Sequence, residues 1–206
     1  CDADRGTIAP GTILELPAGS ATNFAVQAIQ YYHIQAVATN DGPIDGFDFV
    51  ASPTNACLFN WSAIPAGAHI LRALFAPDLA ASNTPIWWLA DNYQTNDFDS
   101  AARSDTDEDG MPAWAEYMAG TDPTNAESVL RIIAIGLNDG SNYVVWTGGG
   151  ATDLPPFVVQ RKTNGWASAW EPAGQVQHSP LRGSNTWFDD LPPSQAYYRV
   201  VVTNAP

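Results

Sequence analysis

The sequence predicts a mainly β protein in which two small β modules are joined by a short helical connector. Apolar runs of strand length, separated by turns rich in Gly, Pro, Asn and Asp, fill residues 1–78 and recur over residues 129–206. The intervening residues 79–128 contain two apolar segments of helix length that each open with a proline. We therefore expect a β module, a helical connector and a small antiparallel sandwich in these three ranges.

The strands of the two modules are predicted from apolar alternation and from the turns that bound them. In the N-terminal module the expected strands are "GTILEL" (11–16), "TNFAVQAI" (22–29), "YYHIQAVATN" (31–40) and "HILRALFA" (69–76). In the C-terminal module they are "VLRIIAIGL" (129–137), "NYVVWTG" (142–148), "PFVVQRKT" (156–163), "TWFDDL" (186–191) and "AYYRVVVT" (196–203). Short strands at this spacing are typical of a small antiparallel sandwich.

The two helices expected in the connector have start and stop signals supplied by proline and glycine. In "TPIWWLADNY" (84–93), Thr84 is placed to cap the helix and Pro85 to occupy its first position, where a missing N–H costs little. In "PAWAEYMAG" (112–120), Pro112 opens the helix. The final glycine closes it, because glycine readily adopts the left-handed backbone of a helix C-terminus.

The stretch "DTDEDGMPAWAE" (105–116) crowds carboxylates around a single glycine. It has Asp at its first, third and fifth positions, Gly at its sixth and Glu at its twelfth, which is the spacing of a calcium-binding loop. Asp side chains at alternate positions can turn their oxygens toward one hard cation. The alternative is an acidic surface turn, but without a cation these carboxylates would repel one another at close range. The expected ligands are Asp105, Asp107, Asp109, the backbone carbonyl of Met111, and Glu116.

Two features distinguish this loop from the paired loops of calcium sensors. Its eighth position is Pro112, which lacks the backbone N–H through which paired loops bridge. The preceding "DFDSAARS" is also too short for a full entering helix. We therefore expect a single fixed loop, in which the neighbouring Asp97, Asp99 and Asp122 serve as helix caps rather than as ligands.

Charge and composition exclude several classes of function. A formal net charge of −14, with Lys162 as the only lysine, argues against sequence-independent binding to nucleic acids. No apolar run approaches the ~18 residues that a membrane helix needs. No motif pairs a nucleophile with a base, so we expect no enzymatic activity. The chain begins with Cys1 and carries no signal peptide, which is expected of a mature chain or of a fragment of a longer one.

Two further candidate sites involve cysteine and tryptophan. Cys1 and Cys57 are either two unrelated thiols or one disulfide that attaches the N-terminus to the first module. Trp166 and Trp170 lie in the turn-rich "TNGWASAWEP", so their rings are candidates for stacking on a sugar. The alternative for most of the tryptophans is packing within a core or between modules.

Three stretches resemble parts of large secreted surface proteins of bacteria. The stretch "GTIAPGTILELPAGSATNFAVQA…YYHIQAVATNDG…FNWSAIPAGAHILRALFA" resembles a bacterial extracellular repeat module. The stretch "TPIWWLADNY…DFDSAARSDTDEDGMPAWAEYMAGTDPTNAESVLRI" is similar to an EF-hand-like calcium-binding linker related to thrombospondin type 3 repeats, found near the C-termini of such proteins. The stretch "VVWTGG…PFVVQRKTNGW…WEPAG…TWFDDLPPSQAYYRV" resembles a fibronectin type III or immunoglobulin-like domain.

The resemblance implies a non-enzymatic extracellular protein stiffened by Ca²⁺, in a surface layer, an adhesin stalk or a filament. The repeat module normally begins with a strand before its "G-x-I-x-P" turn, whereas only "CDADR" precedes Gly6 here. That strand would come from a longer chain or from another molecule, so neighbouring domains or further copies of this chain are the expected partners. The alternative function is a carbohydrate-binding accessory module of a larger secreted hydrolase, with glycans as partners.

Overall fold

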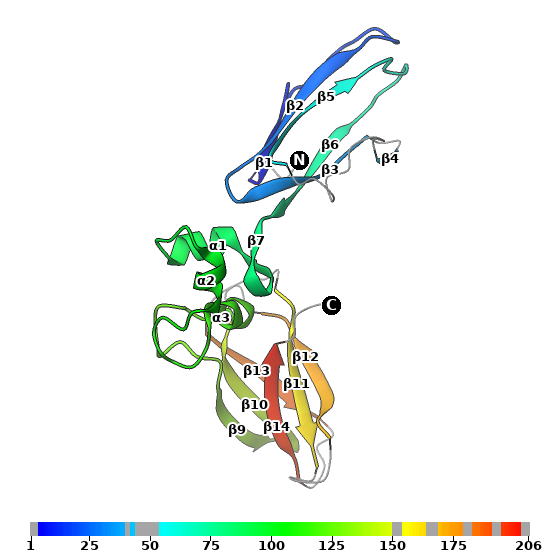
Figure 1. The fold of residues 1–206 in the computed structure, drawn as a ribbon. Coiled ribbons are helices and arrows are strands. Elements are labelled where there is room, and N and C mark those ends of the chain that lie inside the picture. Colours follow the sequence, from blue (N-terminus) through cyan, green and yellow to red (C-terminus); the bar gives the residue numbers. More distant parts are fainter. Residues whose placement is uncertain are drawn as a thin grey trace. The chain divides into compact units, whose positions relative to one another are not determined.

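The computed structural model describes residues 4–39, 42–43, 54–149, 154–163, 169–178, 183–190 and 195–202 (Figure 1). Within these ranges the protein is mainly β, with several small antiparallel sheets, which confirms the mainly β part of the prediction. The chain divides into two compact units. The first unit contains residues 1–80 and 85–87, and the second contains residues 81–84 and 88–206.

The first unit contains two three-stranded antiparallel sheets. One sheet has the order β1-β2-β5, with strands β1 (Gly6–Ala9), β2 (Thr22–Ala28) and β5 (Ala56–Trp61). The other has the order β4-β3-β6, with strands β4 (Gly42–Pro43), β3 (Tyr32–Thr39) and β6 (Leu71–Pro77). Alternate side chains of a strand point to opposite faces, so each sheet contributes its apolar row to one core. The core residues are Val26, Ala28, Ile34, Val37, Ala73 and Phe75.

In the residues that the structure describes, the second unit contains two short helices, most of a third, and two three-stranded antiparallel sheets. The helices are α1 (Ile86–Asn92), α2 (Phe98–Arg103) and α3 (Ala113–Ala119), and the boundary between the two units falls within α1. One sheet has the order β13-β10-β9, with strands β13 (Gly183–Asp189), β10 (Ser141–Gly148) and β9 (Ile132–Asn138). The other has the order β12-β11-β14, with strands β12 (Glu171–Val176), β11 (Phe157–Lys162) and β14 (Tyr197–Val202). The short elements β7 (Leu79–Ala80), η1 (Ala81–Asn83) and β8 (Thr84–Pro85) precede α1.

The core of the second unit joins one residue pair from each sheet. Val144 and Trp146 of β10 and Phe157 and Val159 of β11 are all fully buried. The rings of Trp146 and Phe157 meet edge to face, with their centroids 5.6 Å apart. Burying large aromatic side chains contributes more to a small core than any other single type of contact. The sequence "YVVW" of β10 therefore alternates two core residues with two others, as a strand covered on one face should.

One predicted strand is wrong, and six of the described strands were not predicted. Residues 11–16 form no strand, because no strand of the described chain is hydrogen-bonded to them and the N-terminal strand of the sheet is β1 instead. The unpredicted strands are β1, β4, β5, β7, β8 and β12. The sequence "EPAGQV" of β12 contains Pro and Gly, which weaken a strand locally, and β12 forms only through its pairing with β11. All the other predicted strands overlap observed ones.

Helix α1 starts after Pro85 rather than at it. Thr84 and Pro85 belong to β8, and the Thr84 hydroxyl donates a hydrogen bond to the Ala81 carbonyl oxygen at 2.8 Å. The predicted start at Pro85 is therefore wrong by one residue, because the local turn uses the threonine hydroxyl. Helix α3 likewise starts one residue after its proline, with Pro112 as its N-cap, and it ends as predicted at Gly120, its left-handed C-cap.

A buried polar network connects the two sheets of the second unit. Asp189 of β13 is 4% exposed and accepts two hydrogen bonds from the Arg161 guanidinium of β11, at 2.7 and 2.6 Å. The Tyr198 hydroxyl of β14 donates to the same carboxylate at 2.9 Å, and Asn142 of β10 donates to that hydroxyl at 2.9 Å. One carboxylate thus satisfies donors from two strands of the opposite sheet, which stabilises the pairing of the sheets.

Replacing Asp189 by Ala is expected to lower the free energy of unfolding by about 2–3 kcal/mol. The Arg161 guanidinium and the Tyr198 hydroxyl would lose their shared acceptor in a largely buried position, although Arg161 is partly exposed and can recover some hydration. The neighbouring Asp190→Ala is the control, because that carboxylate is exposed and accepts a hydrogen bond from the Ser141 hydroxyl outside the network. Urea unfolding measures both variants, and equal losses for the two would contradict the role of the network.

Candidate metal centre

The acidic loop connects two short helices, α2 and α3, of which α2 has a side-chain cap. Asp97 caps α2 by accepting a hydrogen bond from the Ser100 N–H at 3.1 Å, as predicted. Asp99 accepts from the Ala81 N–H at 2.8 Å. At the far end of the loop the Ala113 N–H donates to the Ser104 carbonyl oxygen at 2.9 Å, which joins the end of α2 to the start of α3. The loop is therefore closed by its own backbone.

Three carboxylates converge inside this loop. The side chains of Asp105, Asp107 and Asp109 each offer an oxygen, and these oxygens all lie within 4.8 Å of one another. Backbone N–H groups orient two of the carboxylates, because Gly110 donates to Asp105 Oδ2 at 2.9 Å and Met111 donates to Asp109 Oδ1 at 2.7 Å. Gly110 has φ of +95°, a left-handed conformation that glycine adopts without steric cost. The glycine predicted for the sharp turn thus occupies it.

Glu116, one turn into α3, is fully buried beside this cluster. Its Oε1 accepts a hydrogen bond from the Thr121 hydroxyl at 3.3 Å, whereas its Oε2 is buried with no hydrogen-bond partner among the described residues. One oxygen of Asp107 and one of Asp109 are buried without such a partner as well. Buried carboxylate oxygens in folded proteins are almost always hydrogen-bonded or bound to a metal. The orphaned oxygens of Asp107 and Asp109, in one cluster and within electrostatic reach of Glu116, therefore fit a cation.

The electrostatics of the metal-free loop also favour a bound cation. Burial of Glu116, with further repulsion from the Asp107 and Asp109 carboxylates, raises the pKa of Glu116 to about 8. Burial likewise raises the pKa of Asp109, which the Asp107 and Asp105 carboxylates raise further. Without a cation, Glu116 is therefore mostly protonated at neutral pH. A divalent cation would replace that proton and would neutralise the repulsion among the carboxylates.

The structure brings together the side chains of three predicted ligand residues, Asp105, Asp107 and Asp109, and places Glu116 near enough for the charges of Asp107 and Asp109 to act on it. The fifth, Met111, was predicted to contribute its backbone carbonyl, and its N–H is fixed by the hydrogen bond to Asp109. Metal coordination by the Met111 carbonyl oxygen stays a prediction. Sequence reasoning missed Thr121, which is 2% exposed and donates to Glu116, because the hydroxyl reaches the site only when the chain turns back after α3.

The end of α3 is joined to the sheets of the second unit by a close backbone contact. The Gly149 N–H donates to the Ala119 carbonyl oxygen at 2.8 Å. A Cβ on Gly120 would lie 2.6 Å from the backbone of Gly149, so glycine is required for this approach. Glu116 and this contact lie on the same short helix. A cation bound by Glu116 would therefore connect the acidic loop with the end of β10.

The other candidate sites of the sequence have different surroundings. The Lys162 ammonium and the Arg199 guanidinium lie over the Trp170 ring, 4.8 and 4.6 Å from its centroid. These cations occupy ring surface that a sugar would use. Trp166 lies outside the described residues. Cys57 is half-buried in β5, where burial raises the pKa of its thiol, and Cys1, its predicted disulfide partner, lies outside the described residues.

Comparison of the chain with family models, with curated proteins and with solved structures gives no match. Among the residues that the structure describes, no helix has both the length and the apolar character needed to cross a bilayer. The geometry of the acidic loop is therefore the observation on which a function can be built.

Proposed function

We propose that residues 105–116 bind one Ca²⁺ and that the protein is a non-enzymatic structural module that this ion stabilises. The observation that carries the proposal is the set of orphaned, buried oxygens on Asp107, Asp109 and Glu116. Folding places these oxygens where their charges oppose one another, and a cation removes that cost. The bound ion supplies positive charge and coordination, while the chain supplies the oxygens and their orientation.

The donor set favours calcium over other divalent cations. The cluster at the site consists of three Asp carboxylates, which are hard oxygen ligands, whereas zinc prefers nitrogen and sulfur. Magnesium demands near-ideal octahedral geometry and gives up its water reluctantly, so an all-protein cage of several carboxylates suits it poorly. Calcium accepts six to eight oxygens in flexible geometry, which matches a loop with Asp side chains at alternate positions.

The proposed role of the ion is to fasten the helical connector rather than to transmit a signal. Glu116 ties the loop to α3, and the Ala119–Gly149 hydrogen bond ties α3 to the sheets of the same unit. Pro112 at the eighth position has no N–H for pairing with a second loop, which supports a single fixed site. On this proposal the connector over 79–128 is a calcium-stiffened link between a repeat module over 1–78 and an immunoglobulin-like sandwich over 129–206.

An extracellular location follows from the same proposal, because calcium reaches millimolar concentrations outside cells and extracellular modules bind it with weak affinity. We place the protein in a surface layer, an adhesin stalk or a filament. The cation–π contacts on Trp170 favour this structural role over sugar binding, since a sugar would have to displace Lys162 and Arg199 from the ring.

Calcium is expected to raise the melting temperature of the protein. For an affinity of ~1 mM and ~10 mM calcium, mass action adds about 1.4 kcal/mol to the free energy of unfolding. For a protein of this size that corresponds to a rise of about 3–6 °C. Melting curves in calcium, in magnesium and in chelator measure the effect. An equal rise in magnesium would contradict the selectivity, and identical curves in all three solutions would overturn the proposal.

A further inference from the structure

Strand β9 of the second unit leaves apolar side chains in water on the face that is turned toward the opposite sheet. Ile135 pairs with Val144, which is fully buried in the core, so both side chains lie on the same face of their sheet. Leu137 pairs with Asn142, whose side chain reaches Tyr198 of the opposite sheet. Ile135 and Leu137 therefore face that sheet, yet they are 54% and 70% exposed. These two residues form the uncovered margin of β9.

The margin is uncovered because the opposite sheet ends at β14. At the other side of the sandwich β12 lies against β13, since a Cβ on Gly174 would meet the Trp187 ring. The strand orders therefore place β9 and β14 together at the remaining side. In the described part of the chain β14 pairs only with β11, and no other backbone hydrogen bond joins it to a neighbouring segment. One further strand beside β14 would lie opposite the uncovered margin.

The two faces of β14 differ in the side chains that they offer to such a strand. Tyr198, Val200 and Val202 pack against the core, so they point toward the other sheet. Because successive side chains of a strand alternate, Arg199 and Val201 point to the outer face, where Arg199 is exposed. A strand that fits this edge has apolar side chains on its inner face and an acidic side chain opposite Arg199 on its outer face.

Residues 11–16 of the first unit have this pattern and no strand partner. Within the described chain no backbone hydrogen bond joins the segment "GTILEL" to another segment. In an extended strand Leu14 and Leu16 lie on one face, and Ile13 and Glu15 lie on the other. Ile13 is 97% exposed and Glu15 is exposed as well. The segment therefore offers both the backbone and the side chains of a strand that its own unit does not pair.

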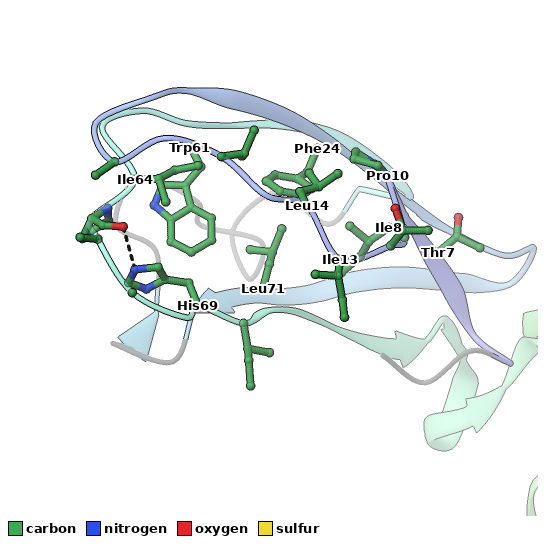
Figure 2. A pocket seen from close by; sticks show the side chains of 18 of the residues that line it. Thr7, Ile8, Pro10, Ile13, Leu14, Phe24, Trp61, Ile64, His69 and Leu71 are labelled. Atoms are coloured by element: carbon green, nitrogen blue, oxygen red, sulfur yellow. Dashed lines mark hydrogen bonds between the residues drawn. The ribbon is translucent and has the colours of Figure 1, made fainter.

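Within its own unit this segment lies along an apolar groove with a volume of about 840 Å³ (Figure 2). Figure 2 shows Ile13 and Leu14 on a segment that faces the segment of His69 across the groove. Leu14 and Leu16 belong to the lining but remain 38% and 42% exposed. Because these side chains are still partly in water, the segment loses little buried apolar area when it leaves the groove.

We propose that residues 11–16 of one copy of this chain add as a strand to the outer edge of β14 in a second copy. The added strand hydrogen-bonds to β14 and buries apolar side chains that both copies leave in water. Segment and edge are different surfaces, so the contact is heterologous, and association continues to a ring or to an open fibre. The inference rests on the proposed structural function, for which it supplies the contact that builds a filament or surface layer.

Charge sets the register of the contact. Glu15 is the only charged residue of the segment, and Arg199 is the only charged residue of β14. Antiparallel pairing with Glu15 opposite Arg199 puts Leu14 opposite Val200, so that Leu14 and Leu16 face the uncovered margin of β9. A slip of one residue would turn both leucines outward and would place the Glu15 carboxylate against apolar side chains.

Sedimentation velocity of the full chain in calcium, over a series of concentrations, tests the contact. The wild-type protein is expected to form species larger than a dimer as its concentration rises. Glu15→Arg and Arg199→Glu are each expected to weaken association by about three- to tenfold, because like charges then lie opposite each other. The double variant exchanges the two charges and should associate like the wild type. Arg72→Glu and Glu127→Arg are the matched controls, since both residues are exposed and lie outside the contact.

Two further variants disable one side of the contact each. Leu16→Glu disables the segment and Ile135→Glu disables the uncovered margin, and both positions are partly exposed, so neither change empties a core. Each variant alone is expected to associate at least about tenfold more weakly, because a carboxylate would enter apolar surroundings. Leu58→Glu is the control, since Leu58 is 69% exposed and lies outside the contact.

The mixture of the two disabled variants gives the sharpest result. Leu16→Glu keeps its β14 edge and Ile135→Glu keeps its segment, so an equimolar mixture should form one-to-one dimers and nothing larger. A monomeric wild-type protein, a double charge variant that associates as weakly as its single variants, or a mixture that stays monomeric would each overturn the proposal. The calcium site is judged by melting curves and the contact by sedimentation, so either proposal can fail without the other.

Discussion

The Glu116→Gln variant is expected to be more stable than the wild-type protein in chelator at neutral pH and to lose its response to calcium. Glutamine has nearly the shape of protonated glutamic acid and can still accept a hydrogen bond from Thr121, but unlike Glu116 it needs no proton uptake on folding at neutral pH. Without a charged twelfth ligand, calcium affinity should fall at least about tenfold, since that residue closes the coordination shell with two oxygens.

The same variant should flatten the pH dependence of the metal-free protein. The pKa of Glu116 is about 8 in the folded protein and 4.5 for a glutamate in water, so between these values the folded protein holds a proton that the unfolded chain releases. The contribution of Glu116 to stability is therefore fully present below pH 4.5 and is lost as the pH rises toward 8. Between about pH 5 and pH 7 the loss is about 2–3 kcal/mol. Calcium binding displaces the proton, so the apparent affinity for calcium should rise with pH over the same range.

Urea unfolding in chelator between about pH 5 and pH 8, together with calcium titrations, measures both effects. The exposed Glu108→Gln is the matched control, because Glu108 lies in the same loop at a position that the calcium pattern does not use. His178 has the opposite effect on the pH dependence of stability. Burial lowers its pKa, so its protonation at low pH opposes folding. Each variant is therefore compared with the wild type at equal pH. Unchanged calcium affinity in Glu116→Gln would refute the assignment of this ligand.

Replacing Gly120 by Ala is expected to destabilise the protein by about 2–4 kcal/mol. Part of the cost is conformational, because Gly120 has φ of +67° and a residue with a Cβ is strained there by about 1 kcal/mol. The larger part is steric, because the new Cβ would lie 2.6 Å from the carbonyl group of Gly149. That group is backbone, so the end of α3 and the chain just after β10 would have to separate, at about 1–3 kcal/mol.

Gly140→Ala separates the two contributions. Gly140 also has a positive φ, +85°, but no atom of the described residues beyond its chain neighbours lies within 4 Å of the position of its Cβ. This control should lose only the conformational part, about 1 kcal/mol. Urea unfolding of both variants isolates the contact between α3 and the sheets. If the two glycines prove equally sensitive, the close approach of Gly120 to Gly149 is not a determinant of stability.

The parts of the fold that local rules control were predictable. Helix α3 begins after Pro112 and ends at Gly120 because the fixed φ of proline and the left-handed backbone of glycine act within one or two residues. The α2 cap at Asp97 is local as well. Strand β12 was missed because its Pro and Gly are poor strand residues, and only the pairing with β11 makes it a strand. Residues 11–16 show the converse, an apolar segment with strand character and no partner strand in the described part of the chain.

For the acidic loop, the sequence alone determined the residue types and their spacing, because an interval of two residues and a following glycine bring Asp105, Asp107 and Asp109 together without help from the rest of the chain. Tertiary structure decided how strongly these groups need a cation. Burial of Glu116 against the Asp carboxylates depends on where α3 packs, and that packing depends on the distant Gly149. The apolar groove and the uncovered margin of β9 were likewise decided by which strands find partners, since exposure is a property of neighbours and not of a residue.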